Sequence, residues 1–145
     1  MKKINLFQKT YIDILCPLYT ENLWHIISLI NNNQISHNEL KTTVLSILNY
    51  LLENKILFVI DEIIDNKTFI RSKLNKDQTI QFIDSKWNEK IDFMDLYLLA
   101  WFRFEDWYID GLTKKGLVSI KDWQKFVAKE IGDLEKWINN NKPKE

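Results

Sequence analysis

The chain has 145 residues, of which 46% are hydrophobic and 13% aromatic, with only three glycines and two prolines. This composition excludes an intrinsically disordered chain and predicts a single folded domain over residues 1–145. Twenty basic residues balance twenty acidic ones, which argues against an extended nucleic-acid surface, because such surfaces neutralise many phosphates. The one cysteine, Cys16, excludes an intramolecular disulfide, and we expect it to be a small buried residue of a cytoplasmic protein.

The N-terminal part of the chain predicts two helices. Apolar residues recur every three or four positions from Ile4 to Leu18, which is the stripe of an amphipathic helix that Pro17 would end. Thr20 is a suitable N-cap for a second helix, which the run of asparagines at 31–33 would end. The expected buried face of this second helix consists of Leu23, Trp24, Ile26, Ile27 and Ile30.

A capping box starts the next helix. In Ser36-His37-Asn38-Glu39, the serine oxygen accepts from the backbone of Glu39 and the glutamate reaches back to the amide of Ser36. We therefore predict a helix from His37 to Glu53, closed by Asn54 in the left-handed conformation. The apolar run at 56–60 is typical of a buried strand, and 68–71 of a return strand after the turn-like residues 65–67. We expect a β-hairpin from 56 to 71.

A fourth helix is predicted from Lys76, with Asn75 or Asp77 as its cap. Its apolar positions are Ile80, Ile83 and Trp87, although residues 79–82 also alternate as a strand would.

The segment Phe93–Phe102 has Asp95 as its only polar side chain, so a helix there would be apolar on every face and would need partners all around it. With half of the roughly twenty residues that a membrane span requires, it is better explained as the centre of a core than as a membrane anchor. We expect Asp92 to cap this central helix.

The C-terminal part predicts an exposed turn or loop at 112–115, between Gly111 and Gly116, and then one long amphipathic helix from Ser119 to Ile138. Residues 139–145 should form a frayed tail. Together these elements predict a predominantly helical α+β fold, with five or six helices around the central apolar helix and one short β-hairpin.

Two segments carry an excess of acidic residues and are the candidate docking surface. Residues 61–66 contain three acids and no base, and in residues 105–110 acids alternate with large aromatics. Trp and Tyr are typical anchors of protein interfaces, and acids favour a basic partner. The predicted partner-binding residues are Asp61, Glu62, Asp65, Glu105, Asp106, Trp107, Tyr108 and Asp110. Packing of Trp107 and Ile109 into the core, with solvated acids around them, is the alternative.

The sequence contains no Gly-rich phosphate loop, nucleophile elbow or Cys/His zinc pattern. His25 and His37 are best explained as packed or capping residues. Carboxylates at 61, 62 and 65, or at 92 and 95, suit Mg2+ or Ca2+ in type, but no calcium loop with a central glycine is present. We therefore expect no metal, no cofactor and no enzymatic activity. Whether the chain forms a homodimer stays open.

A winged helix-turn-helix regulator is the alternative function, because the helix 37–53 is followed by the hairpin 56–71, which would be the wing. In that layout the helix would enter the major groove of DNA. Lys41 is its only base, however, and Asp61, Glu62 and Asp65 on the wing would repel phosphates. These charges disfavour nucleic acid as the partner.

The order of elements resembles a family of small, uncharacterised bacterial proteins encoded near polymorphic toxins and regarded as immunity proteins of contact-dependent growth inhibition systems. The likeness covers most of residues 20–138. It lies in Trp24-His25-Ile26, in the run Leu51-Leu52-Glu53-Asn54-Lys55-Ile56, in Trp87 and in Glu135-Lys136-Trp137-Ile138. The resemblance implies a cytoplasmic protein that neutralises a cognate toxin, in many cases a nuclease with a basic cleft, by stoichiometric binding. It implies no catalytic residues.

Overall fold

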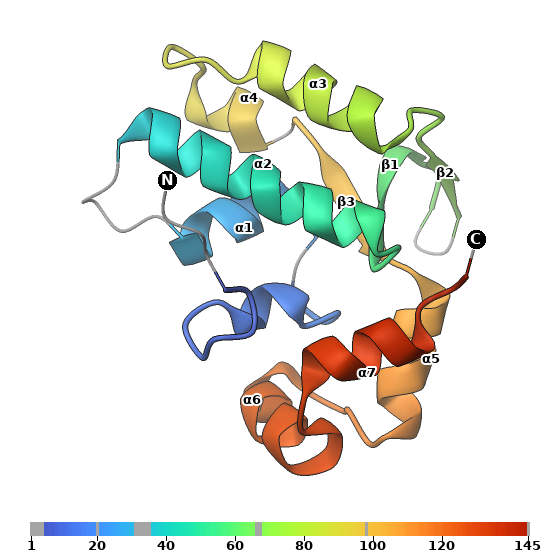
Figure 1. The fold of residues 1–145 in the computed structure, drawn as a ribbon. Helices are drawn as coiled ribbons and strands as arrows, with labels where there is room; N and C mark the ends of the chain where they lie inside the picture. The colour runs from blue at the N-terminus through green and yellow to red at the C-terminus, as the bar shows by residue number, and fades with distance from the viewer. Residues whose placement is uncertain (1–4, 20, 31–35, 66–67, 98, 145) are drawn as a thin grey trace.

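The computed structural model describes residues 5–19, 21–30, 36–65, 68–97 and 99–144. Helices and a small antiparallel sheet alternate along the chain, which confirms the mostly helical α+β fold (Figure 1). The helices are α1 (Leu23–Ile30), α2 (His37–Glu53), α3 (Lys76–Lys86), α4 (Phe93–Tyr97), α5 (Asp106–Lys114), α6 (Trp123–Phe126) and α7 (Leu134–Asn141). The strands are β1 (Leu57–Ile63), β2 (Phe69–Arg71) and β3 (Trp101–Phe104).

The predicted N-terminal α-helix from Ile4 to Leu18 is wrong. Within residues 5–19 the only helical element is the 3-10 turn Ile12–Leu15, and the segment otherwise consists of turns. The consecutive residues Ile14, Leu15 and Cys16 are all buried, and one face of an amphipathic helix would not bury all three. The carbonyls of Ile12 and Leu15 accept hydrogen bonds from side chains of the C-terminal part of the chain. These bonds replace those that an α-helix would make.

The predicted bounds of α2 are confirmed, but the predicted left-handed conformation of Asn54 is wrong. Ser36 Oγ accepts from the Glu39 amide at 3.2 Å, which is one of the two hydrogen bonds of the predicted capping box. At the other end the left-handed residue is Lys55, with φ 57°, and not Asn54, with φ −88°. The predicted buried face of α1 is confirmed except for Trp24, which is half-buried. Thr20 and the asparagines at 31–33 lie outside the described residues.

The sheet has the order β2-β1-β3, and every pairing is antiparallel. The predicted hairpin is confirmed, with Ile60 opposite Arg71 and Ile63 opposite Phe69. β1 has an irregularity between Ile60 and Glu62. On its other side β1 pairs with β3, so that Leu57 lies opposite Phe104.

The predicted central helix is wrong. Residues 93–97 form the short helix α4, and after it the chain extends into β3. β3 fits between β1 and the backbone at residues 21–23, because Phe102 N donates to Glu21 O at 2.6 Å and Leu23 N to Ala100 O at 3.1 Å. Phe102 and Phe104 point into the core, so alternation and not a helical surface satisfies this apolar run. The cap is confirmed: Asp92 Oδ1 accepts from Asp95 N at 2.9 Å.

α3 is the predicted fourth helix. Asn75 Oδ1 accepts from Gln78 N at 2.8 Å, and the Gln78 side chain accepts from Asn75 N at 3.0 Å. This reciprocal cap fixes the start of the helix, and the alternative of a strand at 79–82 does not occur.

The predicted long C-terminal helix is divided. Gly132 adopts φ 80°, which ends the π-helical turn Val127–Ile131, and Asp133 caps the separate helix α7. The loop predicted at 112–115 is instead the end of α5, with Leu112 fully buried. The tail prediction is wrong for 139–142: α7 runs to Asn141, and Lys142 Nζ donates to Asn54 Oδ1 at 2.8 Å.

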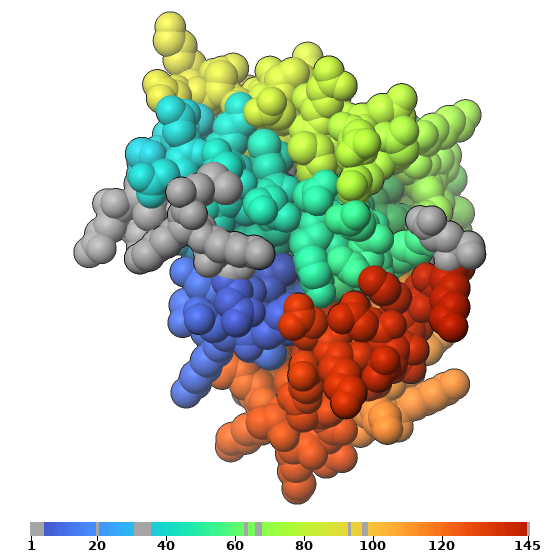
Figure 2. All heavy atoms as spheres, viewed as in Figure 1, coloured from blue at the N-terminus to red at the C-terminus, as the bar shows by residue number. Residues whose placement is uncertain are grey.

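The N-terminal segment, residues 5–19, packs against the C-terminal part of the chain. In Figures 1 and 2 it occupies, in blue, the space between α2 and the C-terminal helix α6. Trp123 Nε1 donates to Ile12 O at 2.9 Å, and Gln124 Nε2 donates to Lys9 O and to Asp13 Oδ1, each at 3.1 Å. The C-terminal helices therefore hold the N-terminal segment in place by hydrogen bonds as well as by packing.

The contact between α5 and α7 leads to a stability prediction at Gly111. A Cβ at this position would lie 2.9 Å from two ring atoms of Trp137. Replacing a helical glycine by alanine normally stabilises by about 1 kcal/mol. Here we expect Gly111→Ala to lower the free energy of unfolding by about 1–3 kcal/mol, because the Trp137 ring is stacked on Trp107 and must shift. Urea unfolding measures this, with Lys114→Ala on the exposed side of α5 as the control. A stabilised Gly111→Ala variant would contradict this packing.

Candidate functional site

The acids of the hairpin lie together at the end of β1. Asp61, Glu62 and Asp65, here called the hairpin acids, are exposed. Asp65 Oδ1 accepts from Thr68 N at 2.7 Å, which closes the turn by an aspartate-backbone hydrogen bond. Ile64, which lies between Glu62 and Asp65 in the sequence, has 58% of its surface exposed. The hairpin thus exposes one apolar side chain and three carboxylates within five residues of sequence.

The acids around α5 have two different roles. Glu105 precedes the helix, and both of its carboxylate oxygens lie 2.7 Å from Nη2 of Arg71 on β2. Glu105 therefore joins the start of α5 to the sheet. Asp106 and Asp110, here called the α5 acids, are exposed and lie four residues apart, on one side of the helix.

The two aromatic residues predicted as anchors for a partner pack into the domain. Tyr108 is fully buried, and its hydroxyl donates to Leu15 O at 2.5 Å. Burial holds the pKa of this hydroxyl well above its usual value, so it stays a hydrogen-bond donor. Trp107 is half-buried, donates from Nε1 to Lys55 O at 2.5 Å and stacks on Trp137 with ring centroids 6.1 Å apart. Of the segment 105–110, a partner can most readily reach the α5 acids.

The structure does not bring the two groups of acids into one cluster. Leu57, at the start of β1, lies opposite Phe104, and Glu105 and α5 follow Phe104 directly. The hairpin acids begin after Ile60, toward the other end of β1. Four residues of strand span about 13 Å, so the two groups lie at opposite ends of the sheet.

Between the two ends is a surface that the sequence analysis missed. The outer face of the sheet, defined by Phe58, Ile60, Phe69, Arg71, Trp101 and Arg103, carries both arginines of the chain. The Arg71 guanidinium lies 3.8 Å from the centre of the Phe58 ring, and that of Arg103 lies 5.1 Å from Phe69. Both arginines are exposed, and both phenylalanines are half-buried. Arginine and aromatic residues are the types enriched at the centres of protein interfaces.

A sequence signal for this face existed. In each strand an aromatic residue is followed two positions later by another outer-face residue: Phe58 and Ile60, Phe69 and Arg71, Trp101 and Arg103. Alternation of this kind places side chains on one face of a sheet. The sequence analysis missed this signal because the helix that it predicts over 93–102 includes the first two residues of β3, Trp101 and Phe102.

The histidines and the cysteine make contacts typical of packed residues. His25 Nδ1 accepts from the Glu21 amide at 3.0 Å, and the His37 ring meets the Trp87 ring edge-on at 6.0 Å. Cys16 is buried, as predicted, and burial raises the pKa of its thiol to about 11. None of these contacts joins Cys16 to a histidine. A thiol with this pKa is almost entirely protonated at neutral pH and is a poor nucleophile.

The described residues contain neither a metal-binding cluster nor a membrane-spanning helix. They contain no group of three or more His, Cys, Asp and Glu side chains placed to hold a metal ion. No helix among them is both long and apolar enough to span a bilayer.

Comparisons with protein-family models, with curated proteins and with known structures found no match for this chain. The resemblance to immunity proteins thus remains an expectation from the sequence.

The raised pKa of Cys16 predicts a loss of stability at alkaline pH. A group whose pKa is higher in the folded state stabilises the fold below its unfolded pKa, near 9.0, and loses that contribution as pH rises through about 11. Between these values the free energy of unfolding should fall by up to roughly 1.4 kcal/mol per pH unit for this one group. Urea unfolding between pH 7.5 and 10.5 should therefore show a smaller loss for Cys16→Ala than for the parent protein. Equal losses would show that the native thiol ionises freely.

Proposed function

We propose that this chain is an immunity-type binding protein that neutralises a cognate bacterial toxin by stoichiometric binding. The observation that carries the proposal is the described part of the hairpin, where Ile64 is 58% exposed and the hairpin acids, its near neighbours in sequence, are exposed as well. An apolar contact with a charged rim is the usual composition of a protein interface. The carboxylates would steer the protein toward a basic surface, such as the cleft of a nuclease.

The position of these residues suits a docking element. Asp61, Glu62 and Ile64 are exposed in the described part of the hairpin, so a partner can contact them without rearrangement of the core. The turn of the hairpin is held by the Asp65 to Thr68 hydrogen bond, which lowers the entropy cost of binding. Blocking of the toxin by occupation of its cleft requires no chemical step by this chain.

The alternative, a winged-helix DNA regulator, is less well supported by the surface of α2. The exposed positions of this helix are Asn38, Glu39, Thr42, Ser46 and Glu53, which include two acids and no base. Its only lysine, Lys41, lies 2.8 Å from the Asp84 carboxylate of α3. A helix with this surface would approach the phosphates of DNA with net negative charge.

A charge reversal at the hairpin tests the proposal. The double variant Asp61→Lys and Glu62→Lys should weaken binding to the toxin encoded by the neighbouring gene by at least about tenfold, mainly through a slower association rate. It should also reduce the dependence of that rate on salt. Asp65 is left unchanged because its carboxylate closes the turn. Surface plasmon resonance measures both rates.

Two further variants complete the test. Glu89→Lys with Glu130→Lys makes the same change of charge at exposed positions outside the hairpin, and should bind like the parent. Asp106→Lys with Asp110→Lys shows whether the α5 acids contribute. Unchanged affinity and salt dependence in the hairpin variant would remove the hairpin as the docking element. Absence of any binding to the neighbouring gene product would contradict the proposed function itself.

A further inference from the structure

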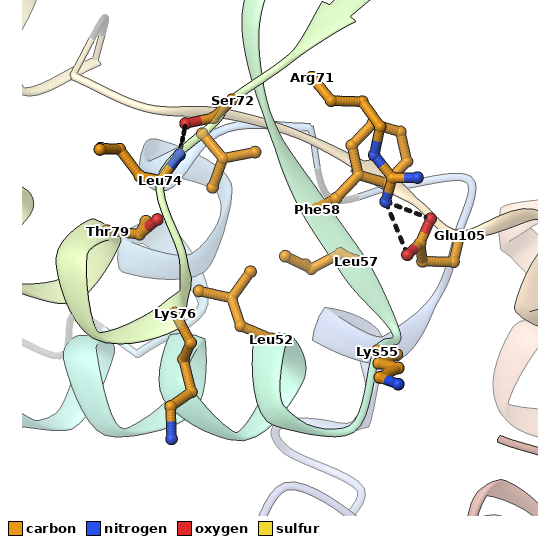
Figure 3. Close-up of a pocket in the computed structure, with 11 residues that line it drawn as sticks. Leu52, Lys55, Leu57, Phe58, Arg71, Ser72, Leu74, Lys76, Thr79 and Glu105 are labelled. Carbon is orange, nitrogen blue, oxygen red and sulfur yellow. Dashed lines mark hydrogen bonds and ion pairs between the residues drawn. The ribbon is translucent and has the colours of Figure 1, made fainter. Parts of the chain in front are cut away.

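A hollow of about 210 Å³ lies between the end of α2, the start of α3 and the sheet (Figure 3). Its apolar surface includes Leu52, Leu57 and Leu74. Pockets for drug-sized ligands usually measure about 300–1,000 Å³, so this hollow has the size for one inserted side chain. Phe58 and Arg71 of the outer face are among its lining residues.

The charged residues of the hollow are predominantly basic. Lys55, Arg71 and Lys76 line it, and Glu105 is the one acid among its lining residues. The lining therefore carries a net charge of plus two, in a chain whose formal net charge is zero. An apolar surface with a basic rim is complementary to an apolar side chain flanked by carboxylates.

Arg71 has capacity for a second carboxylate. Its contacts with Glu105 both use Nη2, at 2.7 Å, while a guanidinium has five N–H donors on three nitrogens. The guanidinium plane is held over Phe58, with Cζ 3.8 Å from the ring centre. The remaining donors are thus presented in a fixed orientation, which favours recognition of a carboxylate.

Lys55 occupies a position where the backbone favours another residue. Its φ of 57° lies in the left-handed region, which glycine or asparagine adopts at the end of a helix at lower cost. The fold itself uses the carbonyl of this residue, which accepts from Trp107 Nε1. That contact does not need a lysine side chain. A lysine is thus present at position 55 although its backbone conformation is unfavourable for lysine. We infer that its ammonium group has a role at the hollow, which Lys55 lines.

Lys76 is held loosely. Its Nζ lies 4.0 Å from Glu53 and 3.7 Å from Asp77, and neither of these acids lines the hollow. Contacts of this length between partly exposed groups are weak and are readily exchanged for a better partner.

We propose that this hollow binds a short acidic segment of a partner protein, with one apolar side chain in the hollow and the flanking carboxylates at Lys55, Arg71 and Lys76. This proposal shares one assumption with the proposed function, namely that the chain binds a partner protein, to which the acidic segment would belong. It concerns a surface distinct from the hairpin acids, so either proposal can fail without the other.

The test uses a peptide probe and amide chemical shifts. The probe is the acetylated and amidated peptide Gly-Glu-Leu-Glu-Gly, titrated at low salt into the full chain labelled with nitrogen-15. We expect saturable shifts confined to the amides of 52–59, 71–79 and 105, which weaken as salt is added. The peptide Gly-Gln-Leu-Gln-Gly keeps the apolar side chain without the charges and should bind more weakly.

Two variants separate binding from folding. Lys55→Asn places a residue suited to the left-handed backbone, so it should preserve stability while it removes one charge. Combined with Lys76→Gln, it should weaken the peptide by roughly threefold to tenfold, the range expected for two partly exposed charge contacts. Leu74→Ala should also weaken binding without loss of the fold, because Leu74 is 45% exposed. Lys115→Asn, at an exposed position beyond α5, is the matched control.

Four results would overturn the proposal. The first is the absence of saturable shifts in the hollow, and the second is equal binding of the glutamine peptide. The third is 4-methylpentanoate binding as tightly as the peptide, which would assign the hollow to a small carboxylate. The fourth is a set of shifts in these amides that depends on protein concentration alone. Such shifts would show that a second copy of the chain occupies the hollow.

Discussion

The hydroxyl of Tyr108 holds together parts of the chain that lie far apart in sequence. The ring is fully buried, stacks on Phe104 at 5.4 Å and meets Trp137 edge-on at 6.0 Å, while the hydroxyl donates to Leu15 O. One side chain thereby contacts β3, α7 and the N-terminal segment. A buried carbonyl without a partner costs about 1–3 kcal/mol, so this hydroxyl cannot be removed without consequence.

The same aromatic cluster positions both candidate binding surfaces. Trp107 stacks on Trp137 and bonds to Lys55 O, which fixes the turn between α2 and β1. That turn places Lys55 at the hollow and starts the strand that ends in the hairpin acids. Glu105, which lies one helical turn before Ile109 at the start of α5, forms an ion pair with Arg71. This ion pair connects α5 to β2. The surfaces proposed to bind partners therefore belong to a body whose interior is held by aromatic stacking and by hydrogen bonds to backbone carbonyls.

The sequence predicted the helix starts and the hairpin, which depend on residues close together in the chain. The caps at Ser36, Asn75 and Asp92 and the hairpin are confirmed, because each involves residues close in sequence. Residues 93–102 were misassigned because a short apolar run suits a buried strand as well as a helix, and only the pairing with β1 decides between them. The exposure of the hairpin acids followed from composition. The pairing of Glu105 with Arg71, 34 residues away, and the outer face of the sheet depend on tertiary structure, which no local pattern contains.

The most direct measurement compares the free energy of unfolding of two tyrosine variants. Tyr108→Phe leaves the Leu15 carbonyl unpaired and should lose about 1–3 kcal/mol in urea unfolding. Tyr50→Phe removes a buried hydroxyl for which the described residues supply no hydrogen-bond partner, so stability should stay the same or rise. A Tyr108→Phe variant as stable as the parent, or two variants with equal losses, would contradict the role assigned to the Tyr108 hydroxyl.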